Sequence, residues 1–395
     1  MGVTLLACLA IGGPLAVVYS YAGYPLLLFL LAAVRQGWRD AAFVFGKQER
    51  RRSALAGLPG VAVVISAFNE ARHIRARIEN LLQLEYPADL VRIYVGSDGS
   101  SDDTGAIIGS FADPRVVALD FAHNRGKASV LNDLVARGTE PIVVFSDANT
   151  YFEKNAVLEL VAGFGDPEVG CVSGELRLKA ADGANQDSLY WRVEQFLKFF
   201  EARLGALLGA NGAIYAIRRE LWRPLRPDTI CDDFCVAMNV AAARRRVIYA
   251  ARAWAEEDTP ASIGEEYGRR VRIGIGNFQA LWRHPEYFWR TRAATRVAYL
   301  SHKVLRWIAP HLLLVALAAS LLLALHSRGW ALYGALQLAA YALAASLWWA
   351  SERQVRLPGL LRMVAFLFAL NWAFLVASVR FVTGNYRGSW ARTRR

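Results

Sequence analysis

Carboxylates that could hold a metal ion or accept a proton are concentrated in three short segments of this chain. These segments are Ser97-Asp98-Gly99-Ser100, Ser146-Asp147-Ala148-Asn149 and Cys231-Asp232-Asp233-Phe234. The first two directly follow short apolar runs that have the composition of buried strands. Because open α/β sheets bind ligands beyond the carboxyl ends of their strands, we expect the acidic groups to meet at one edge of a sheet.

Asp147 and Asn149 form the pattern Asp-x-Asn at the end of a predicted strand. Two oxygen donors one residue apart can hold Mg²⁺ or Mn²⁺ on a nucleotide diphosphate, since these ions prefer carboxylate, phosphate and water oxygens. A turn, or a helix cap ahead of Glu153, would need the same residue types. On its own the segment leaves both interpretations open.

Asp98 and the pair of Asp232 and Asp233 also allow two interpretations each. Asp98 could accept hydrogen bonds from a ribose or a base, whereas its Gly and Ser neighbours are equally typical of a turn before a helix. Asp232 and Asp233 lie among apolar residues, so their repulsion raises at least one of the two pKa values, as suits a general base. A helix N-cap is the structural alternative for this pair.

Basic residues elsewhere in the chain could neutralise phosphate. Lys127 stands at the predicted start of a helix, where it could contact a phosphate, but Phe121 occupies the position at which a Walker motif needs glycine. Arg269, Arg270 and Arg272 could neutralise a departing diphosphate. A solvated or lipid-facing basic surface is the alternative for these arginines.

Alternating strands and helices must position these side chains. Apolar, β-branched runs predict strands over residues 61–66, 91–96, 116–119, 141–146, 169–178 and 246–251. Helices are expected over 70–84 and 186–208, and from Asp102 and Asp103 onward, because acidic residues favour a helix N-terminus. This alternation predicts an α/β fold with a mostly parallel sheet and right-handed crossovers.

Long apolar runs lie on both sides of the α/β stretch. The uncharged run up to Val34 contains two Gly- and Pro-bearing interruptions and predicts one kinked membrane span. Runs over 307–325, 330–350 and 359–382 each reach the roughly 20 residues that cross a bilayer. Basic residues after the first run place that side in the cytoplasm. Four spans then leave the basic C-terminal tail outside, in conflict with the same rule, unless one segment is re-entrant or interfacial.

We therefore expect six parts in a multi-pass protein of the cell (inner or plasma) membrane. They are a transmembrane segment (1–34), a basic linker (35–60), a cytoplasmic catalytic domain (61–283), an interfacial amphipathic helix (284–306), three transmembrane helices (307–382) and a basic tail (383–395).

The composition limits the classes of molecule that this chain is expected to bind. The net charge of +12 over 395 residues is compatible with nucleic acid, anionic lipid or an anionic substrate. No nucleic-acid-binding motif is present, so we expect a lipid bilayer and a phosphate-bearing substrate. Cys231 and Cys235 lack the further ligands that a zinc site requires. Unpaired thiols suit a reducing cytoplasm.

Taken together, these segments resemble the membrane-integrated family 2 glycosyltransferases, of the cellulose, chitin and hyaluronan synthase type. The matching segments lie between residues 61 and 283 and are Val64-Ile-Ser-Ala-Phe-Asn-Glu70, Gly96-Ser-Asp-Gly-Ser-Ser-Asp102, Asn124-Arg-Gly-Lys-Ala128, Phe145-Ser-Asp-Ala-Asn149, Gly209-Ala-Asn-Gly-Ala213, Asp232-Asp233 and Arg269-x-x-Arg272. The resemblance implies an A-type nucleotide-binding fold, a nucleotide-sugar donor such as a UDP-sugar, and a carbohydrate or lipid acceptor.

The resemblance also implies roles for single residues on the donor side. Ala67 and Glu70 would lie beside the nucleotide, and Asp98 would hold the uridine. Asp147 would bind the Mg²⁺ or Mn²⁺ ion on the diphosphate, with Asn149 in place of the usual second aspartate.

On the acceptor side, Asp233 corresponds to the family's catalytic base. Arg272 corresponds to the arginine of the Gln-x-x-Arg-Trp signature, which contacts the diphosphate. The signature glutamine is Arg269 here, and the tryptophan that would stack on the acceptor sugar is Ile273. The loss of that tryptophan argues against processive polymer synthesis.

The expected activity is that of an inverting, metal-dependent hexosyltransferase acting on a growing polysaccharide, which it could also export. The alternative is a single sugar addition to a membrane lipid, favoured by Ile273 and by the small number of spans. A non-catalytic nucleotide-sugar-binding subunit is disfavoured, because Asp98, Asp147, Asp233 and Arg272 are all retained.

Overall fold

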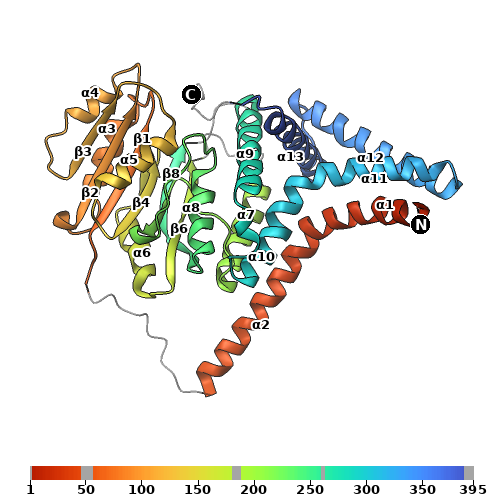
Figure 1. Cartoon of the computed structure of the whole chain (residues 1–395), viewed down its shortest axis with the longest axis horizontal. Helices are drawn as coiled ribbons and strands as arrows, with labels where there is room; N and C mark the ends of the chain where they lie inside the picture. The colour runs from red at the N-terminus through yellow and green to blue at the C-terminus, as the bar shows by residue number, and fades with distance from the viewer. Residues whose placement is uncertain (1, 46–56, 180–187, 259–262, 387–395) are drawn as a thin grey trace. The chain divides into compact units, whose positions relative to one another are not determined.

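The computed structural model describes residues 2–45, 57–179, 188–258 and 263–386 (Figure 1). The chain forms two compact units. The sheet unit comprises Leu28–Thr259 and His284–Ala298. The helical unit comprises Met1–Leu27, Pro260–Arg283 and Tyr299–Tyr386.

The sheet unit contains one eight-stranded sheet in the order β3-β2-β1-β4-β7-β6-β8-β5. Its strands are β1 (Val61–Ala67), β2 (Val91–Asp98), β3 (Val116–Phe121), β4 (Ile142–Asp147), β5 (Tyr151–Phe152), β6 (Val169–Lys179), β7 (Tyr215–Arg218) and β8 (Arg246–Asp258). All six predicted strands are present, and β5 and β7 are additional. The fold class is confirmed as α/β.

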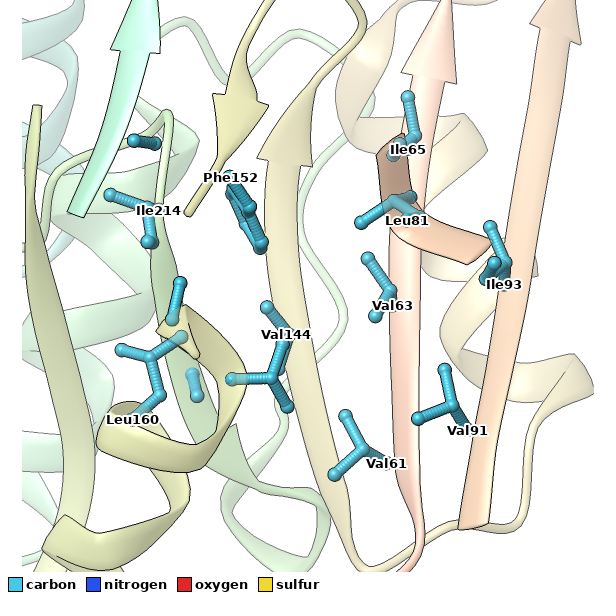
Figure 2. Close-up of a cluster of buried hydrophobic side chains, with 14 of the residues drawn as sticks. Val61, Val63, Ile65, Leu81, Val91, Ile93, Val144, Phe152, Leu160 and Ile214 are labelled. Carbon is cyan, nitrogen blue, oxygen red and sulfur yellow. The ribbon is translucent and has the colours of Figure 1, made fainter. Parts of the chain in front are cut away.

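The β3-β2-β1-β4 half of the sheet is parallel, as predicted. Every residue of β1 is buried, because helices cover both faces of a parallel sheet and its central strands become continuous apolar runs. Figure 2 shows Val61, Val63 and Ile65 of β1 lying along one face of this core. The register of β1 pairs Ala67 with Ser97 and Ser66 with Asp147, so the three strands end at the same level.

The other half of the sheet is mixed. β7 runs antiparallel to both β4 and β6, β8 runs parallel to β6, and β5 runs antiparallel to β8. β8 extends to Asp258, well beyond the predicted end at residue 251, because its second part continues to pair with β6 after an irregularity in register between Ser173 and Glu175. The sheet is therefore parallel throughout its first half, and in its second half a parallel β6–β8 pair lies among antiparallel neighbours.

Several helices belong to the sheet unit. They are α3 (Ile74–Leu82), α4 (Thr104–Gly109), α5 (Lys127–Arg137), α6 (Ala156–Ala162), α7 (Ser188–Leu204), α8 (Asp232–Ala242) and α10 (Ala293–Ala298). α5 packs on β1 and β2, and α6 packs on β8. The stretch 284–306, expected as one amphipathic helix, is divided into a 3₁₀ turn (Pro285–Phe288), α10 and a π-helical segment (Tyr299–Val304) that leads into α11.

The helical unit is built from α1 (Gly2–Val18), α9 (Ile263–Arg283), α11 (Leu305–Ala324), α12 (Arg328–Glu352) and α13 (Gly359–Val382). A π-helical segment, Tyr19–Gly23, joins α1 to α2 (Tyr24–Phe45). By length and composition, the helical stretches Gly2–Ala41, Ala293–Ala324, Arg328–Glu352 and Gly359–Val382 are suited to cross a bilayer. The side chains of the basic C-terminal residues lie outside the described part of the chain.

The two π-helical segments meet inside the helical unit. Ser20 Oγ donates to the carbonyl oxygen of Ser301 over 2.7 Å, and the hydroxyls of Tyr19 and Ser301 lie 2.9 Å apart. A π-helical turn holds one residue more than an α-helical turn, so it leaves backbone groups without their usual partners. The side chain of Ser20 supplies such a partner, and it does so next to the predicted interruption at Gly23.

Candidate active site

Asp98 ends β2 and is fully buried. Its Oδ1 accepts a hydrogen bond from the backbone N of Arg125 at 2.8 Å, and its Oδ2 accepts one from Gly126 at 2.9 Å. Gly126 has a φ of +87°, a conformation that favours glycine. Asp98 thus shapes the turn that precedes Lys127. Each oxygen retains a second lone pair, which the predicted uridine contact would require.

Lys127, the first residue of α5, joins two of the acidic segments. Its Nζ lies 2.8 Å from Oδ1 of Asp147 and 3.3 Å from Oδ2 of Asp232. Burial alone would lower the pKa of Lys127, but the nearby carboxylates of Asp147 and Asp232 outweigh burial and raise it. Lys127 therefore stays positively charged and holds the end of β4 close to the start of α8.

Asp233 has the electrostatic surroundings of a base. Burial and the neighbouring carboxylate of Asp232 raise the pKa of Asp233 to about 6, while Lys127 opposes part of this shift. Its Oδ2 accepts a hydrogen bond from the backbone N of Gly212 over 3.1 Å. Asp233 can therefore exchange a proton near neutral pH, as a general base must.

Asp147 is the last residue of β4, as predicted, and Asn149 lies two residues beyond it. The amide Nδ2 of Asn149 donates to Oε1 of Glu257 over 2.9 Å, and Glu257 is nearly buried on β8. The sequence analysis did not predict a role for Glu257. This residue lies in the acidic run Glu256-Glu257-Asp258, which is typical of a solvated turn.

The donor set at Asp147 and Asn149 fits a magnesium-type ion. In the part of the chain that the structure describes, no group of three or more His, Cys, Asp and Glu side chains forms a metal site. Asp147 and Asn149 could provide two oxygen ligands. Mg²⁺ usually takes one or two protein carboxylates and completes its coordination with substrate phosphates and water, so two protein ligands suffice.

A buried arginine supports this edge of the sheet. Arg77 of α3 donates through Nη2 to Ser146 Oγ over 2.8 Å, and Ser146 Oγ in turn donates to the carbonyl oxygen of Ala213 over 2.8 Å. Burial lowers the pKa of Arg77 to about 9, while the charge of Asp147 partly opposes the shift. This network connects the residue before Asp147 with the loop whose Gly212 contacts Asp233.

The predicted nucleotide residues Ala67 and Glu70 lie at the end of β1. Ala67 is buried, and the backbone N of Glu70 donates to Thr104 Oγ1 over 2.8 Å. Between them, Asn69 accepts a hydrogen bond from the backbone N of Ser101 over 2.8 Å. These contacts join the loops that follow β1 and β2.

The predicted diphosphate residues Arg269 and Arg272 lie on α9 of the helical unit. Both are exposed, and a spacing of three residues places them on one face of the helix. Arg270 differs, because its guanidinium lies 4.6 Å from the ring centre of Phe366. Ile273, at the position of the signature tryptophan, is 39% exposed.

Among the described residues, the sheet unit brings together Asp98, Lys127, Asp147, Asn149 and Asp233. Two contacts were not predicted from the sequence. Lys127 also contacts Asp232, and Asn149 contacts Glu257. The contribution of Ala67, Glu70, Arg269 and Arg272 to the same site stays a prediction.

Part of this chain is similar to known proteins. Residues 62–247 match the model of glycosyl transferase family 2. The poly-beta-1,6-N-acetyl-D-glucosamine synthase of Staphylococcus epidermidis is 27% identical over 242 residues, covering 59% of this chain and 57% of that protein. The synthase of Staphylococcus aureus strain COL is 24% identical over 242 residues, covering 57% of this chain and 56% of that protein. The match spans little more than half the length of these relatives.

A solved structure shares the fold over almost the whole chain. The mannosyltransferase PcManGT from Pyrobaculum calidifontis, in complex with GDP-Man and Mn²⁺, superimposes with a TM-score of 0.69 at 21% identity. The match covers 96% of this chain and 100% of that one. The family match identifies residues 62–247 as a glycosyl transferase family 2 domain, and the structural likeness shows that this domain has the A-type fold.

Proposed function

We propose that this chain is an inverting glycosyltransferase that moves a sugar from a nucleotide-sugar donor to a growing polysaccharide. The observation that carries the proposal is the double contact of Lys127 with Asp147 and Asp232. This contact brings the predicted diphosphate site next to Asp233, whose pKa is raised to about 6. A site of this kind combines charge neutralisation for a leaving group with a base for a nucleophile.

In the proposed reaction, Asp233 accepts the proton of an acceptor hydroxyl. The hydroxyl oxygen forms a bond to the anomeric carbon, and the bond from that carbon to the diphosphate oxygen breaks on the opposite side. The nucleoside diphosphate leaves with the bonding electron pair. Lys127 would stabilise the negative charge that develops on it, a role that the family resemblance also implies for Arg272.

A divalent ion, Mg²⁺ or Mn²⁺, would contribute further neutralisation of the diphosphate when bound. Asp147 and Asn149 are the residues proposed to hold it. Their oxygen donors suit either ion. We further propose that the chain lies in the inner or plasma membrane with the sheet unit facing the cytoplasm, where nucleotide sugars are available.

The names of the staphylococcal relatives favour a polymer of N-acetylglucosamine as the product and UDP-N-acetylglucosamine as the first donor to test. A second candidate is a single sugar addition to a membrane lipid. The exposed Ile273 favours it, because an aliphatic side chain cannot stack on a sugar ring as tryptophan does. GDP-mannose should be tested as a further donor, because the mannosyltransferase with the same fold was solved in complex with it.

The test uses the full chain purified in detergent or lipid nanodiscs. Nucleoside diphosphate release is measured with UDP-N-acetylglucosamine, UDP-glucose and GDP-mannose, each with Mg²⁺, with Mn²⁺ and with EDTA. Release with one donor, lost in EDTA, is expected. Release with none of these donors would overturn the proposed activity.

Asp233→Asn tests the assignment of the base. We expect this variant to bind the nucleoside diphosphate normally and to lose about 10²- to 10⁴-fold in turnover. Asp89→Asn, an exposed carboxylate in a 3₁₀ turn, is the matched control and should keep full activity. Product size on a gel then distinguishes a polymer from a single addition.

A further inference from the structure

Glu257 occupies a position of β8 whose neighbours on the same face belong to the core. Ala253 and Ala255 are fully buried, and Glu257, the next residue on that face, is only 9% exposed. A carboxylate at a buried position needs polar partners, because an isolated buried charge is costly. The amide of Asn149 is one such partner, with Nδ2 donating to Oε1 of Glu257 over 2.9 Å.

This hydrogen bond determines how the Asn149 side chain is oriented. A carboxylate accepts hydrogen bonds, so the NH₂ group of Asn149 must face Glu257. The amide oxygen Oδ1 then points away from Glu257. Oδ1 is the only atom of this side chain that can bind a cation, and the contact with Glu257 does not use it.

Glu257 also changes the charge of the site. With Asn149 in place of the family's second aspartate, the motif itself carries one carboxylate instead of two. Glu257, in direct contact with the amide, adds a negative charge next to Asn149. Partners of this kind, one step removed from a ligand, orient it and tune the affinity for the metal.

We propose that Glu257 is a positioning residue of the metal site, which holds Asn149 as an oxygen donor and supplies the charge that Asn149 lacks. The inference rests on the proposed function, which assigns a divalent ion to Asp147 and Asn149. It adds that Asn149 and Glu257 act as one pair, in which an amide faces the metal and a carboxylate stands behind it.

Exchanging the two groups tests the pair. Asn149→Asp alone places two carboxylates against each other, and we expect the affinity for Mn²⁺ to fall about 10-fold or more. Asn149→Asp combined with Glu257→Gln restores a carboxylate and an amide in contact, with their positions reversed. This double variant should bind Mn²⁺ within about threefold of the unchanged chain, a difference of less than about 1 kcal/mol. Glu257→Ala should lose about 10- to 100-fold.

Mn²⁺ binding is measured by electron paramagnetic resonance of the free ion, with the full chain in detergent and with UDP or GDP present. Glu256→Gln is the matched control, since Glu256 is the neighbouring residue of β8 and belongs to its other face. This variant should bind Mn²⁺ like the unchanged chain. Thermal unfolding of each variant shows that it is folded before its affinity is compared.

The results separate the pair from the proposed function. If Asn149→Asp alone binds Mn²⁺ as tightly as the unchanged chain, or if Glu257→Gln brings no recovery in the double variant, the role of Glu257 is refuted. If the unchanged chain binds no Mn²⁺ with either nucleotide, the metal site itself is refuted, and the role of Glu257 with it.

Discussion

Lys127 and Asp147 form an ion pair in which Nζ lies 2.8 Å from Oδ1, and the two side chains are only 18% and 29% exposed. The same ammonium group contacts Asp232. One cation therefore lies between the end of β4 and the start of α8, two segments that are far apart in the sequence. Its positive charge offsets part of the negative charge of Asp147, Asp232 and Asp233.

Replacing Lys127 by methionine should disturb both stability and catalysis. Three carboxylates, those of Asp147, Asp232 and Asp233, would lose the charge that they share. Removing one partner of a buried ion pair typically costs about 3–5 kcal/mol. Because Lys127 normally lowers the pKa of Asp233, the residual activity of the variant should also require a higher pH. Thermal unfolding and a pH–rate profile measure the two effects.

Lys154→Met, which removes an exposed lysine, is the control for this substitution. It should leave both the unfolding transition and the pH–rate profile unchanged. An unaltered pH–rate profile in the Lys127 variant would show that Lys127 does not influence the base.

The activity of the unchanged chain should depend on pH through Asp233. The pKa of this carboxyl is raised to about 6, and the base must be deprotonated to accept a proton. Below pH 6 the protonated form dominates, so kcat/KM should fall about tenfold for each further pH unit. Above pH 6 the profile should level off. Nucleoside diphosphate release between pH 5 and pH 8 gives this profile, and a flat rate across that range would place the base elsewhere.

Asp98→Asn should weaken the turn before Lys127. An amide has only one acceptor oxygen, whereas the carboxylate of Asp98 accepts from the backbone N of both Arg125 and Gly126. A buried N–H group that loses its acceptor costs about 1–3 kcal/mol. Chemical unfolding followed by tryptophan fluorescence should therefore reveal a loss of that size, together with weaker binding of the nucleotide.

Asp103→Asn provides the comparison, because Asp103 is exposed and its side chain makes no capping hydrogen bond to α4. Its stability should stay within about 0.5 kcal/mol of the unchanged chain. Equal stability of both variants would mean that the two backbone contacts of Asp98 contribute nothing.

In the helical unit, Gly274 should tolerate no larger side chain. A Cβ atom at this position would lie 2.7 Å from Cβ of Ala377, which is too close for two carbon atoms. Gly274→Val should therefore separate α9 from α13 and cost about 1–3 kcal/mol, as overpacking does. Gly268→Ala, on the same helix with nothing within 4 Å, should instead gain up to about 1 kcal/mol. Thermal unfolding of both variants checks the contrast.

The parallel half of the sheet was predictable because its strands are buried on both faces. Such strands have a continuous apolar sequence, as in β1 and β4, and their boundaries agree with the prediction to within one or two residues. β7 was missed because it has only four residues. The extension of β8 was missed because Glu256 and Glu257 suggest a solvated loop, although pairing with β6 continues there.

The site was predictable in its acidic residues but not in the contacts between them. Asp98 and Asp147 were predicted from strand ends and turn residues, and Asp233 from a pair of carboxylates among apolar residues and from the family resemblance. The sequence holds no sign that Lys127 bridges Asp147 and Asp232, because ion pairs between distant segments depend on the packing of α5 and α8. Likewise, only the structure shows that Asp98 contacts backbone N–H groups. Every residue except proline carries such a group, so the sequence gives no pattern from which this contact could be predicted.

The paired π-helical segments have a consequence for how the helical unit can vary. Each residue advances a helix by about 100°, so the one extra residue in Tyr19–Gly23 or in Tyr299–Val304 sets the rotation of everything that follows it. A deletion in only one segment would turn the hydroxyl of Ser20 away from Ser301. The numbers of residues in the two π-helical segments are thus coupled. Loss of a residue from one segment would require a compensating change in the other.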